Sequence, residues 1–286
     1  EMKPLLKWAG GKARLAPQIA VALGGSCKGV YYEPFIGSAA VFLHLKSHGL
    51  VDRAVLSDAN GKLIEAHRAI RDDVDGVLEA IAALPQDDWR ERYYDVRELY
   101  NAGPWHGVEH AARFFWLNRA CFNGLYRENR KGKYNVPVGS YKSLSFPSRE
   151  AFLAVSEMLQ GVELVQASFA EVMERAGPDD HIYCDPPYVP LSETARFTGY
   201  CHSPFGFEQQ KELAAESRKA AFRGAKVVLS NHDLPVVRHE LYPKQNGFRY
   251  VATPRVARAI SRAAASRVRV AEVIATIGPL KDTQAA

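Results

Sequence analysis

Short apolar runs rich in β-branched residues alternate with amphipathic helical patterns along most of this chain, and this alternation strongly constrains its fold. Six such runs lie at residues 30–35, 54–58, 162–167, 181–185, 226–231 and 271–277. Helical patterns fill several intervals between them, ending at Gly49 and before Gly224. Strands that alternate with helices favour an α/β fold with a mostly parallel sheet, because parallel strands need a crossover connection.

The alternation stops between residues 62 and 150. Two helical patterns, "DDWRERYYDVRELY" and "EHAARFFWLNRACF", occupy this stretch, and the turn-rich segment 123–147 follows them. A chain of 286 residues, 47% of them apolar, can bury a large core and still carry an insertion. We therefore predict one domain formed by residues 1–61 and 150–286, with a helical module inserted at residues 62–149.

Composition disfavours several classes of protein. No run of about 18 apolar residues occurs and the first residues lack a secretory signal pattern, so we expect a cytoplasmic protein. His44 and His48 could share a helix face, but no third ligand stands at a recognisable spacing, and we expect no metal. The cysteines form no Cys-x-x-Cys pair, which disfavours a zinc ribbon or a disulfide framework: Cys27, Cys121, Cys184 and Cys201.

Acidic and basic residues are segregated along the chain, which has a formal net charge of +5. Residues 72–98 contain nine acids and three arginines, whereas residues 113–142 contain seven basic residues and Glu128 as the single acid. A second basic tract, at residues 249–269, has six arginines and no acid. Such segregation favours a polyanionic partner, although solvated helix faces would give the same pattern.

A glycine turn follows the first apolar run, in "YYEPFIGSAAVFL" at residues 31–43. At the carboxyl end of a strand, such a turn lets a ligand approach the backbone near a helix amino terminus. Asp58 ends the next run about twenty residues after Gly37, where an acidic side chain accepts hydrogen bonds from ribose hydroxyls. A dinucleotide would also fit, but G-x-G-x-x-G is absent, and "LLKWAGGK" at residues 5–12 lacks the spacing of a phosphate loop.

The stretch "HIYCDPPYVP" at residues 181–190 places Asp185 at the end of an apolar run. Successive prolines fix the backbone and remove amide donors, which leaves carbonyl oxygens as acceptors. An amino group on an aromatic ring is a poor nucleophile, and the Asp185 carboxylate with the Pro186 carbonyl could accept its two protons and orient its lone pair. Tyr188 could stack on the ring. The alternative interpretation is a proline turn with an exposed aspartate.

Seven stretches together resemble the Dam type of DNA adenine methyltransferase, in the same order over nearly the whole chain. They are "LLKWAGGK" (5–12), "YEPFIGSAAVFL" (32–43), "LSDANGKLI" (56–64), "NRACFNGLYR" (118–127), "YNVPVGSY" (134–141), "IYCDPPYVPLSETARFTGY" (182–200) and "LSNHD" (229–233). The resemblance implies a seven-stranded Rossmann-like methyltransferase sheet, with residues 62–149 as a target-recognition domain. It also implies S-adenosylmethionine as methyl donor, S-adenosylhomocysteine as product, and the exocyclic amino nitrogen of adenine in double-stranded DNA as acceptor.

The resemblance assigns residues to the donor and to the reacting base. Asp185, Pro186 and Tyr188 would hold an adenine that has been flipped out of the duplex, at a cost of roughly a few kcal/mol. Tyr188, and Tyr200 as a further candidate, would offset part of this cost by stacking. The donor would be bound by Trp8, Lys12, Phe35, Gly37, Asp58 and Asp185.

The resemblance also implies that the recognition sequence is GATC. Arg127 would read the third base pair in the major groove, where arginine is a common base-reading side chain, and Lys7 would help to read the first. Phe122 would fill the gap left by the flipped base, and Asn123 would contact the orphaned partner. We expect a monomer that associates with the nucleoid through these DNA contacts: Lys7, Phe122, Asn123, Leu125, Arg127, Pro137 and Tyr141.

Three positions depart from the family pattern. Ala39 stands where the family commonly has a second glycine, which makes a close approach of the backbone to the donor less assured. The C-terminal basic tract lacks the glycine-rich loop expected before "SRVRVAEV" at residues 266–273. Ser140 stands where some relatives carry an additional arginine, so we expect a lower affinity for the DNA backbone.

Other functions use related sequence features. Enzymes that methylate the exocyclic amine of cytosine have a similar motif, which more often begins with serine. In enzymes that methylate a protein amide, the related proline-rich motif usually begins with asparagine. A DNA-binding module without catalytic activity would retain the same fold. The absence of a Pro-Cys nucleophile motif agrees with direct transfer to an amino nitrogen. The sequence leaves the biological role open between marking of DNA for replication or repair and partnership with a restriction enzyme.

Overall fold

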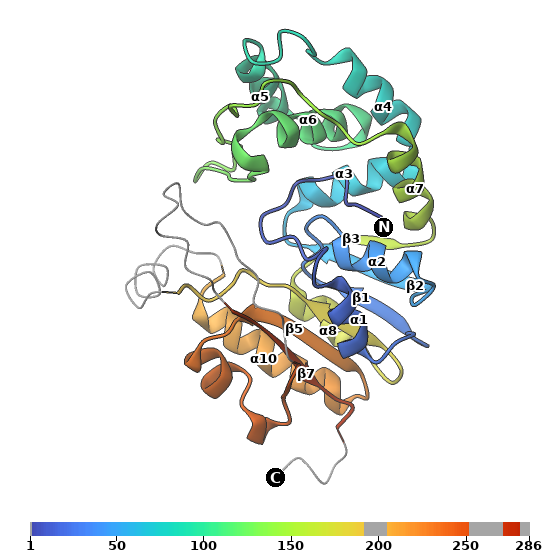
Figure 1. The fold of residues 1–286 in the computed structure, drawn as a ribbon, viewed down its shortest axis with the longest axis vertical. Helices are drawn as coiled ribbons and strands as arrows, with labels where there is room; N and C mark the ends of the chain where they lie inside the picture. The colour runs from blue at the N-terminus through green and yellow to red at the C-terminus, as the bar shows by residue number, and fades with distance from the viewer. Residues whose placement is uncertain (1, 192–204, 252–270, 281–286) are drawn as a thin grey trace. The chain divides into compact units, whose positions relative to one another are not determined.

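A computed structural model describes residues 2–191, 205–251 and 271–280 (Figure 1). Tyr200, Cys201 and the second basic tract beyond residue 251 lie outside the described residues. Seven strands form one sheet in the order β3-β2-β1-β4-β5-β7-β6. Their bounds are β1 Val30–Glu33, β2 Arg53–Asp58, β3 Glu163–Gln166, β4 His181–Cys184, β5 Lys226–His232, β6 Arg249–Val251 and β7 Glu272–Ile277.

The inner strands of the sheet are parallel, as the alternation of strands and helices predicts. Tyr32 of β1 pairs with Val55 of β2 on one side and with Ile182 of β4 on the other. β4 in turn runs parallel to β5. β7 is antiparallel to both β5 and β6. The predicted α/β fold with a Rossmann-like methyltransferase sheet is therefore confirmed, with one reversed strand inserted next to β5.

Burial explains why these runs form strands. All six residues of β7 are buried, as are six of the seven residues of β5. Strands that are covered on both faces need apolar side chains in succession and not in alternation. The "VVL" and "VIA" stretches of β5 and β7 meet this requirement.

The helices follow the predicted patterns closely. "SAAVFLHLKSH" forms α2, "FEQQKELAAESRKAAF" forms α10, and the two patterns of the expected insertion form α5 and α6. The helix bounds are α1 Ala16–Leu23, α2 Ala40–Ser47, α3 Gly61–Asp72, α4 Val74–Ala83, α5 Tyr93–Ala102, α6 Gly107–Ala120, α7 Arg149–Leu159, α8 Phe169–Glu174 and α10 Phe207–Phe222.

Residue packing divides the chain into two compact units. The first unit comprises Glu1–Ala16, Ile36–Gly49 and Asp58–Gln166, and the second comprises Pro17–Phe35, Leu50–Ser57 and Ala167–Ala286. These boundaries differ from those predicted for a catalytic domain and an inserted module, because the first unit also takes in the amino terminus and the glycine turn. The assignment of residues 62–149 to a target-recognition domain remains a prediction.

The first unit has a helical core. α6 packs against α3, α4 and α5, and nine of its fourteen residues are buried. Trp116 on this helix is fully buried and its indole N–H donates to the Pro85 carbonyl at 2.8 Å. In the second unit α10 packs against α8 and β5 (Figure 1).

Among residues 2–191, 205–251 and 271–280, no helix has the length and apolarity needed to cross a membrane. Within those same ranges, no group of three or more His, Cys, Asp or Glu side chains is arranged to hold a metal ion. Cys27, Cys121 and Cys184 are buried free thiols.

Candidate functional site

The glycine turn of the first unit is closely packed against Trp8. Gly37 has φ 47°, and a Cβ atom added to it would lie 2.7 Å from Cδ1 of Trp8. The Gly37 carbonyl also lies 3.0 Å from Nε2 of the buried His67 on α3. Only glycine satisfies both the positive φ and the close approach of the indole. Trp8 stacks with Tyr126 at a centroid distance of 5.9 Å, so the amino-terminal motif and the turn form one cluster.

Ala39 in this turn adopts a left-handed conformation, with φ 59° and ψ 23°. Its N–H donates to the Ile36 carbonyl at 2.7 Å, and α2 begins at the next residue. The family commonly has glycine here, and a left-handed residue costs alanine about 1–2 kcal/mol. Alanine thus keeps the turn that glycine would form more readily.

Asp58 ends β2, where its carboxylate accepts the Asn60 N–H at 2.9 Å. Burial raises the pKa of Asp58 to about 6, while hydrogen bonds from the backbone N–H groups of Asn60, Gly37 and Ala59 act in the opposite direction. Asn60 then caps α3 by accepting from the N–H groups of Lys62 and Leu63. Asp58 and the glycine turn are therefore adjacent in the first unit, as their spacing predicts.

Lys12 is 4% exposed, and its ammonium group donates to the Gly10 carbonyl at 2.5 Å. The backbone carbonyl of Lys12 accepts from the N–H groups of Leu15 and Ala16, which opens the first helix. Phe35 belongs to the second unit, where it stacks on Phe169 at 5.7 Å and meets Phe205 edge-on at 5.5 Å. These two donor candidates thus have different surroundings, one polar and one aromatic.

Asp185 follows β4 directly and is partly exposed. Burial raises the pKa of the neighbouring Tyr183 and Cys184 well above their ordinary values, and the negative charges of Asp185 and Glu33 contribute in the same direction. Glu33 ends the adjacent strand β1, is 3% exposed, and accepts from the Tyr31 hydroxyl at 2.7 Å. Two carboxylates therefore stand at the carboxyl ends of neighbouring parallel strands, where open α/β sheets bind ligands.

Buried polar side chains hold the loop that carries Pro186 and Tyr188. Gln210 donates to the Pro187 carbonyl at 2.6 Å. Asn231 accepts from the Val189 N–H at 3.1 Å and donates to Gln210 at 3.1 Å. Such a network fixes the backbone of a loop that has few amide donors of its own.

Two contacts of the Tyr188 side chain come from strands of the sheet. Its hydroxyl donates to Oε2 of Glu272 at 3.0 Å. The His232 ring meets the phenol ring edge-on with centroids 4.9 Å apart, and Nδ1 of His232 lies 2.7 Å from the Val189 carbonyl. Because β5 and β7 supply these contacts, elements distant in sequence determine where this tyrosine lies.

The predicted DNA-contacting residues all lie in the first unit, most of them on the loop formed by residues 122–141. Isolated bridges join Cys121 to Val138 and Glu128 to Tyr134. The Phe122 N–H donates to the Pro137 carbonyl at 2.9 Å, which closes the base of the loop. We call this segment the 122–141 loop.

Lys7 packs against this loop. Its ammonium group lies 4.3 Å from the centroid of the Tyr141 ring. Asn118 accepts from the Lys7 N–H at 2.8 Å, donates to the Lys7 carbonyl at 2.7 Å, and also donates to the Gly124 carbonyl at 3.3 Å. Burial lowers the pKa of Lys7, and the charge of Arg119 acts in the same direction. Lys7 and Tyr141, predicted from separate motifs, are thus brought together.

Arg127 is exposed, and Asn135 holds it from across the loop. Nε of Arg127 donates to Oδ1 of Asn135 at 2.7 Å, and an Nη atom donates to the Asn135 carbonyl at 3.2 Å.

The other predicted residues of the loop differ in exposure: Leu125 is 37% exposed, Pro137 is exposed and Phe122 is partly buried. Asn123 is exposed in a left-handed conformation with φ 53°. The loop therefore presents most of the predicted residues on its surface.

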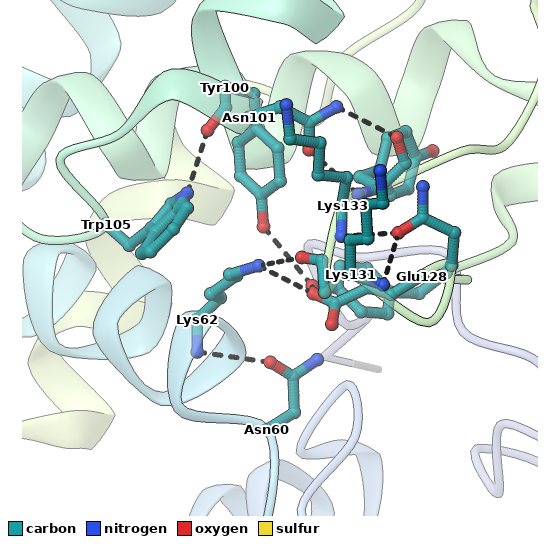
Figure 2. A network of polar contacts seen from close by, with 12 residues as sticks. Asn60, Lys62, Tyr100, Asn101, Trp105, Glu128, Lys131 and Lys133 are labelled. Atoms are coloured by element: carbon teal, nitrogen blue, oxygen red, sulfur yellow. Dashed lines mark hydrogen bonds and ion pairs between the residues drawn. The ribbon is translucent and has the colours of Figure 1, made fainter.

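A polar network ties the same loop to α3 (Figure 2). The Lys62 ammonium group lies 2.8 Å from Oε1 of Glu128 and donates to the Gly132 carbonyl at 2.7 Å. It also lies 4.5 Å from the centroid of the Trp105 ring. The Tyr126 hydroxyl donates to the same Glu128 oxygen at 2.5 Å. One lysine thus joins two points of the loop to the first turn of the helix that follows Asp58.

Comparison with known proteins identifies the family. A family profile described as D12 class N6 adenine-specific DNA methyltransferase matches residues 8–251. The chain belongs to this family. The DNA adenine methylase of Haemophilus influenzae is 36% identical over 283 residues, covering 98% of this chain and 95% of the relative. That of Escherichia coli K12 is 36% identical over 280 residues, covering 97% and 96%.

A third relative comes from an archaeon. The type II methyltransferase M.MjaIII of Methanocaldococcus jannaschii is 36% identical over 244 residues, covering 81% of this chain and 84% of the relative.

The family match and these relatives show that the present chain is an adenine-specific DNA methyltransferase, and its family takes the methyl group from S-adenosylmethionine. The residues of the first unit suit such a donor, since the Asp58 carboxylate lies beside the glycine turn and has the acceptor oxygens that ribose hydroxyls require.

Sequence reasoning missed the buried polar residues that support these sites in the methyltransferase. Some of them lie inside the stretches that carry the family resemblance but were given no role there, and the others lie outside those stretches. A polar residue within an apolar run is a usable signal, as in the "SNH" that ends β5. Buried polar groups are retained where they form hydrogen bonds. The missed residues are Glu33, His67, Asn118, Gln210, Asn231, His232 and Glu272.

Proposed function

We propose that this methyltransferase modifies the N6 nitrogen of an adenine flipped out of duplex DNA, within the sequence GATC. Its partner is double-stranded DNA and its donor is S-adenosylmethionine. The observation that carries the proposal is the 122–141 loop, which presents Leu125, Arg127 and Pro137 at its surface and packs Tyr141 against Lys7. These are the residue types that the resemblance requires for reading GATC.

The donor is held by the cluster around the glycine turn. The Asp58 carboxylate accepts hydrogen bonds from the ribose hydroxyls, and Trp8 and Gly37 shape the adjoining surface. Lys12, Phe35 and Asp185 complete the set that we assign to the donor. Bound there, S-adenosylmethionine supplies an electrophilic methyl group on a sulfonium.

The Asp185 carboxylate and the Pro186 carbonyl accept the two protons of the adenine amino group. Their hydrogen bonds localise the nitrogen lone pair and direct it along the line of displacement. S-adenosylmethionine held by the donor cluster would supply the methyl group to this nitrogen and would be released as S-adenosylhomocysteine, with the electrons of its carbon–sulfur bond on sulfur. The methylated nitrogen is then cationic and loses a proton readily, so Asp185 need not be a strong base.

Base flipping follows from the position of the target nitrogen inside the stacked duplex. Extrusion costs roughly a few kcal/mol. Stacking on Tyr188 recovers about 1–3 kcal/mol. Phe122 fills the gap in the duplex, and Asn123, exposed next to it, contacts the unpaired thymine.

Methylation mapping tests the proposal. Plasmid DNA from a host without methyltransferases is incubated with the enzyme and donor, sequenced for modified bases, and digested for nucleoside analysis. We expect N6-methyladenine confined to GATC. A different consensus would overturn the specificity, and N4-methylcytosine would overturn the choice of base.

A further inference from the structure

Glu272 is an acid at the start of an otherwise largely apolar strand. It is 3% exposed, and the residues that follow it in β7 are Val273, Ile274 and Ala275. Removing a carboxylate from water is costly unless hydrogen bonds compensate for the lost hydration. The Tyr188 hydroxyl provides such a bond at 3.0 Å, across 84 positions of sequence. Because burial of the Glu272 carboxylate costs free energy, its contacts are where a role for it should be sought.

The register of the sheet pairs Glu272 with a second contact of the same tyrosine. In the antiparallel ladder between β5 and β7, Glu272 lies opposite His232. His232 packs its ring edge-on against Tyr188 at 4.9 Å and lies 2.7 Å through Nδ1 from the Val189 carbonyl. One cross-strand pair therefore fixes the hydroxyl and the ring of Tyr188 together, and also the backbone of the next residue.

We propose that Glu272 is a positioning residue that orients Tyr188 for stacking on the flipped adenine. The proposal rests on the role given above to Tyr188. A phenol held at its hydroxyl and also contacted at its ring retains little rotational freedom, so the stacking surface is ordered before the base binds. Preorganisation of this kind favours the reacting geometry, and its loss lowers the rate of methyl transfer more than the affinity for DNA.

A double-mutant cycle tests this coupling. The variants are Tyr188→Phe, which removes the hydroxyl and keeps the ring, Glu272→Leu, which removes the acceptor, and the two combined. The readouts are the single-turnover rate of methyl transfer, the Kd for a GATC duplex, and the fluorescence of a duplex with 2-aminopurine at the target position. We expect each single variant to lose about tenfold in rate, as for a hydrogen bond to a charged group, with the Kd changed less than about threefold.

The combined variant distinguishes positioning from independent roles. If Glu272 acts through the Tyr188 hydroxyl, the double variant is no slower than either single variant. Glu272→Gln retains an acceptor oxygen and should restore the rate to within about threefold of the parent. Losses that multiply in the double variant, or an unchanged rate in Glu272→Leu, would overturn the proposal.

Two further variants separate this inference from a defect in folding and from the proposed function. Tyr250→Phe removes another phenol hydroxyl of the second unit, which donates to the Tyr242 carbonyl at 2.6 Å, and should leave the rate unchanged. If Glu272→Leu does not fold, the cycle is run with Glu272→Ala, which also removes the acceptor, and the double variant is again expected to be no slower than either single variant. If Tyr188→Ala itself keeps the parental rate, the stacking role of Tyr188 fails; if that variant is slow and Glu272→Leu is not, the positioning role of Glu272 alone fails.

Discussion

The Nζ atom of Lys62 lies 2.8 Å from Oε1 of Glu128, and this ion pair joins the first turn of α3 to the residue that follows Arg127 (Figure 2). Both side chains are partly shielded, with exposed fractions of 16% and 30%. The same ammonium group holds the Gly132 carbonyl, so two points of the 122–141 loop depend on it. The pair is therefore placed to fix the loop from which Arg127 projects.

Lys62→Met and Glu128→Gln should both reduce discrimination between GATC and a sequence altered at one base pair. They change the charge of the protein in opposite directions, so a purely electrostatic role would weaken binding to all DNA in the first variant and strengthen it in the second. A positioning role lowers discrimination in both, by about two- to fivefold for a pair worth up to about 1 kcal/mol. Competition binding with cognate and altered duplexes measures this, and opposite shifts in overall affinity with unchanged discrimination would refute the positioning role.

Arg127→Ala should relax the choice at one base pair. Loss of a base contact costs about 1–3 kcal/mol at that position, whereas loss of a phosphate contact weakens binding to all sequences alike. Asn135→Ala serves as the matched variant, because it removes the side-chain acceptor of Arg127 Nε and keeps the guanidinium. We expect a smaller loss at the same base pair, measured by methylation rates on duplexes substituted at each position of GATC. A uniform loss in Arg127→Ala would reassign the residue to the DNA backbone.

Donor binding should weaken as the pH falls through about 6. Burial raises the pKa of Asp58 to about 6, and ribose hydroxyls donate to the ionised carboxylate, so protonation removes the acceptor. Calorimetric titration with donor between pH 5 and pH 8 measures this, with the pH values chosen to bracket that pKa. Asp58→Asn should bind the donor more weakly at neutral pH and show little dependence over the range. A parental profile in the asparagine variant would exclude Asp58 from donor binding.

Asp58 also contributes to the stability of the protein without donor, and this contribution increases as the pH falls, whereas donor binding weakens. Its folded pKa of about 6 lies above the ordinary value of 3.8, so between these two values the folded state binds more protons than the unfolded chain. The contribution of Asp58 to stability therefore decreases as the pH rises through this window and is smallest above it. Comparison of thermal unfolding of the parent and of Asp58→Asn across the window isolates this contribution.

Asp185→Ala should abolish methyl transfer while DNA binding persists. The carboxylate orients the amino group in the reacting geometry and is not required for docking on the duplex. We expect a loss of at least about a hundredfold in the single-turnover rate, with the Kd for DNA within about threefold. Asp185→Asn keeps one acceptor oxygen and should retain more activity than the alanine variant. Activity within about tenfold of the parent in Asp185→Ala would remove the residue from the mechanism.

Ala39→Gly should stabilise the protein. The left-handed conformation of Ala39, φ 59°, costs alanine about 1–2 kcal/mol, and glycine recovers this at a smaller entropic cost in the unfolded chain. We expect a net gain of about 0.5–1 kcal/mol and a Tm raised by roughly 1–4 °C. Ala40→Gly is the control, because it lies in α2 and should lower the Tm. A lower Tm in Ala39→Gly would mean that the alanine methyl group contributes more through packing than the turn costs.

The strands, the longer helices and the glycine turn could be predicted because each depends on a local pattern. The run of β-branched residues in β5 and the helical period of α10 are visible within a few residues. The reversal of β7 could not be predicted, since its apolar sequence would suit a parallel strand equally well. The direction of β7 is evident from its pairing with β5, which no local pattern encodes.

Motif residues were also predictable, whereas the residues that hold them were not. Asp58 and Gly37 have the spacing of a nucleoside site, and the structure places them together. Asn118 and Glu272 act across more than eighty positions of sequence, so their partners emerge only from the fold. The domain boundaries, the monomeric state and the recognition sequence remain predictions.

The 122–141 loop owes part of its shape to main-chain hydrogen bonds, in addition to side-chain contacts such as that of Glu128 with Lys62. Backbone bonds join Phe122 to Pro137, Gly139 to Ala120 and Asn135 to Arg127. A substitution at an outward-facing position, short of proline at a donor, leaves these bonds in place. The loop can therefore accept new side chains without being redesigned, and a different target sequence is reachable by a few exchanges at Leu125, Arg127 and neighbouring surface positions, while Asp185 and the donor cluster stay as they are. Altered specificity in this enzyme is in that sense a short evolutionary step.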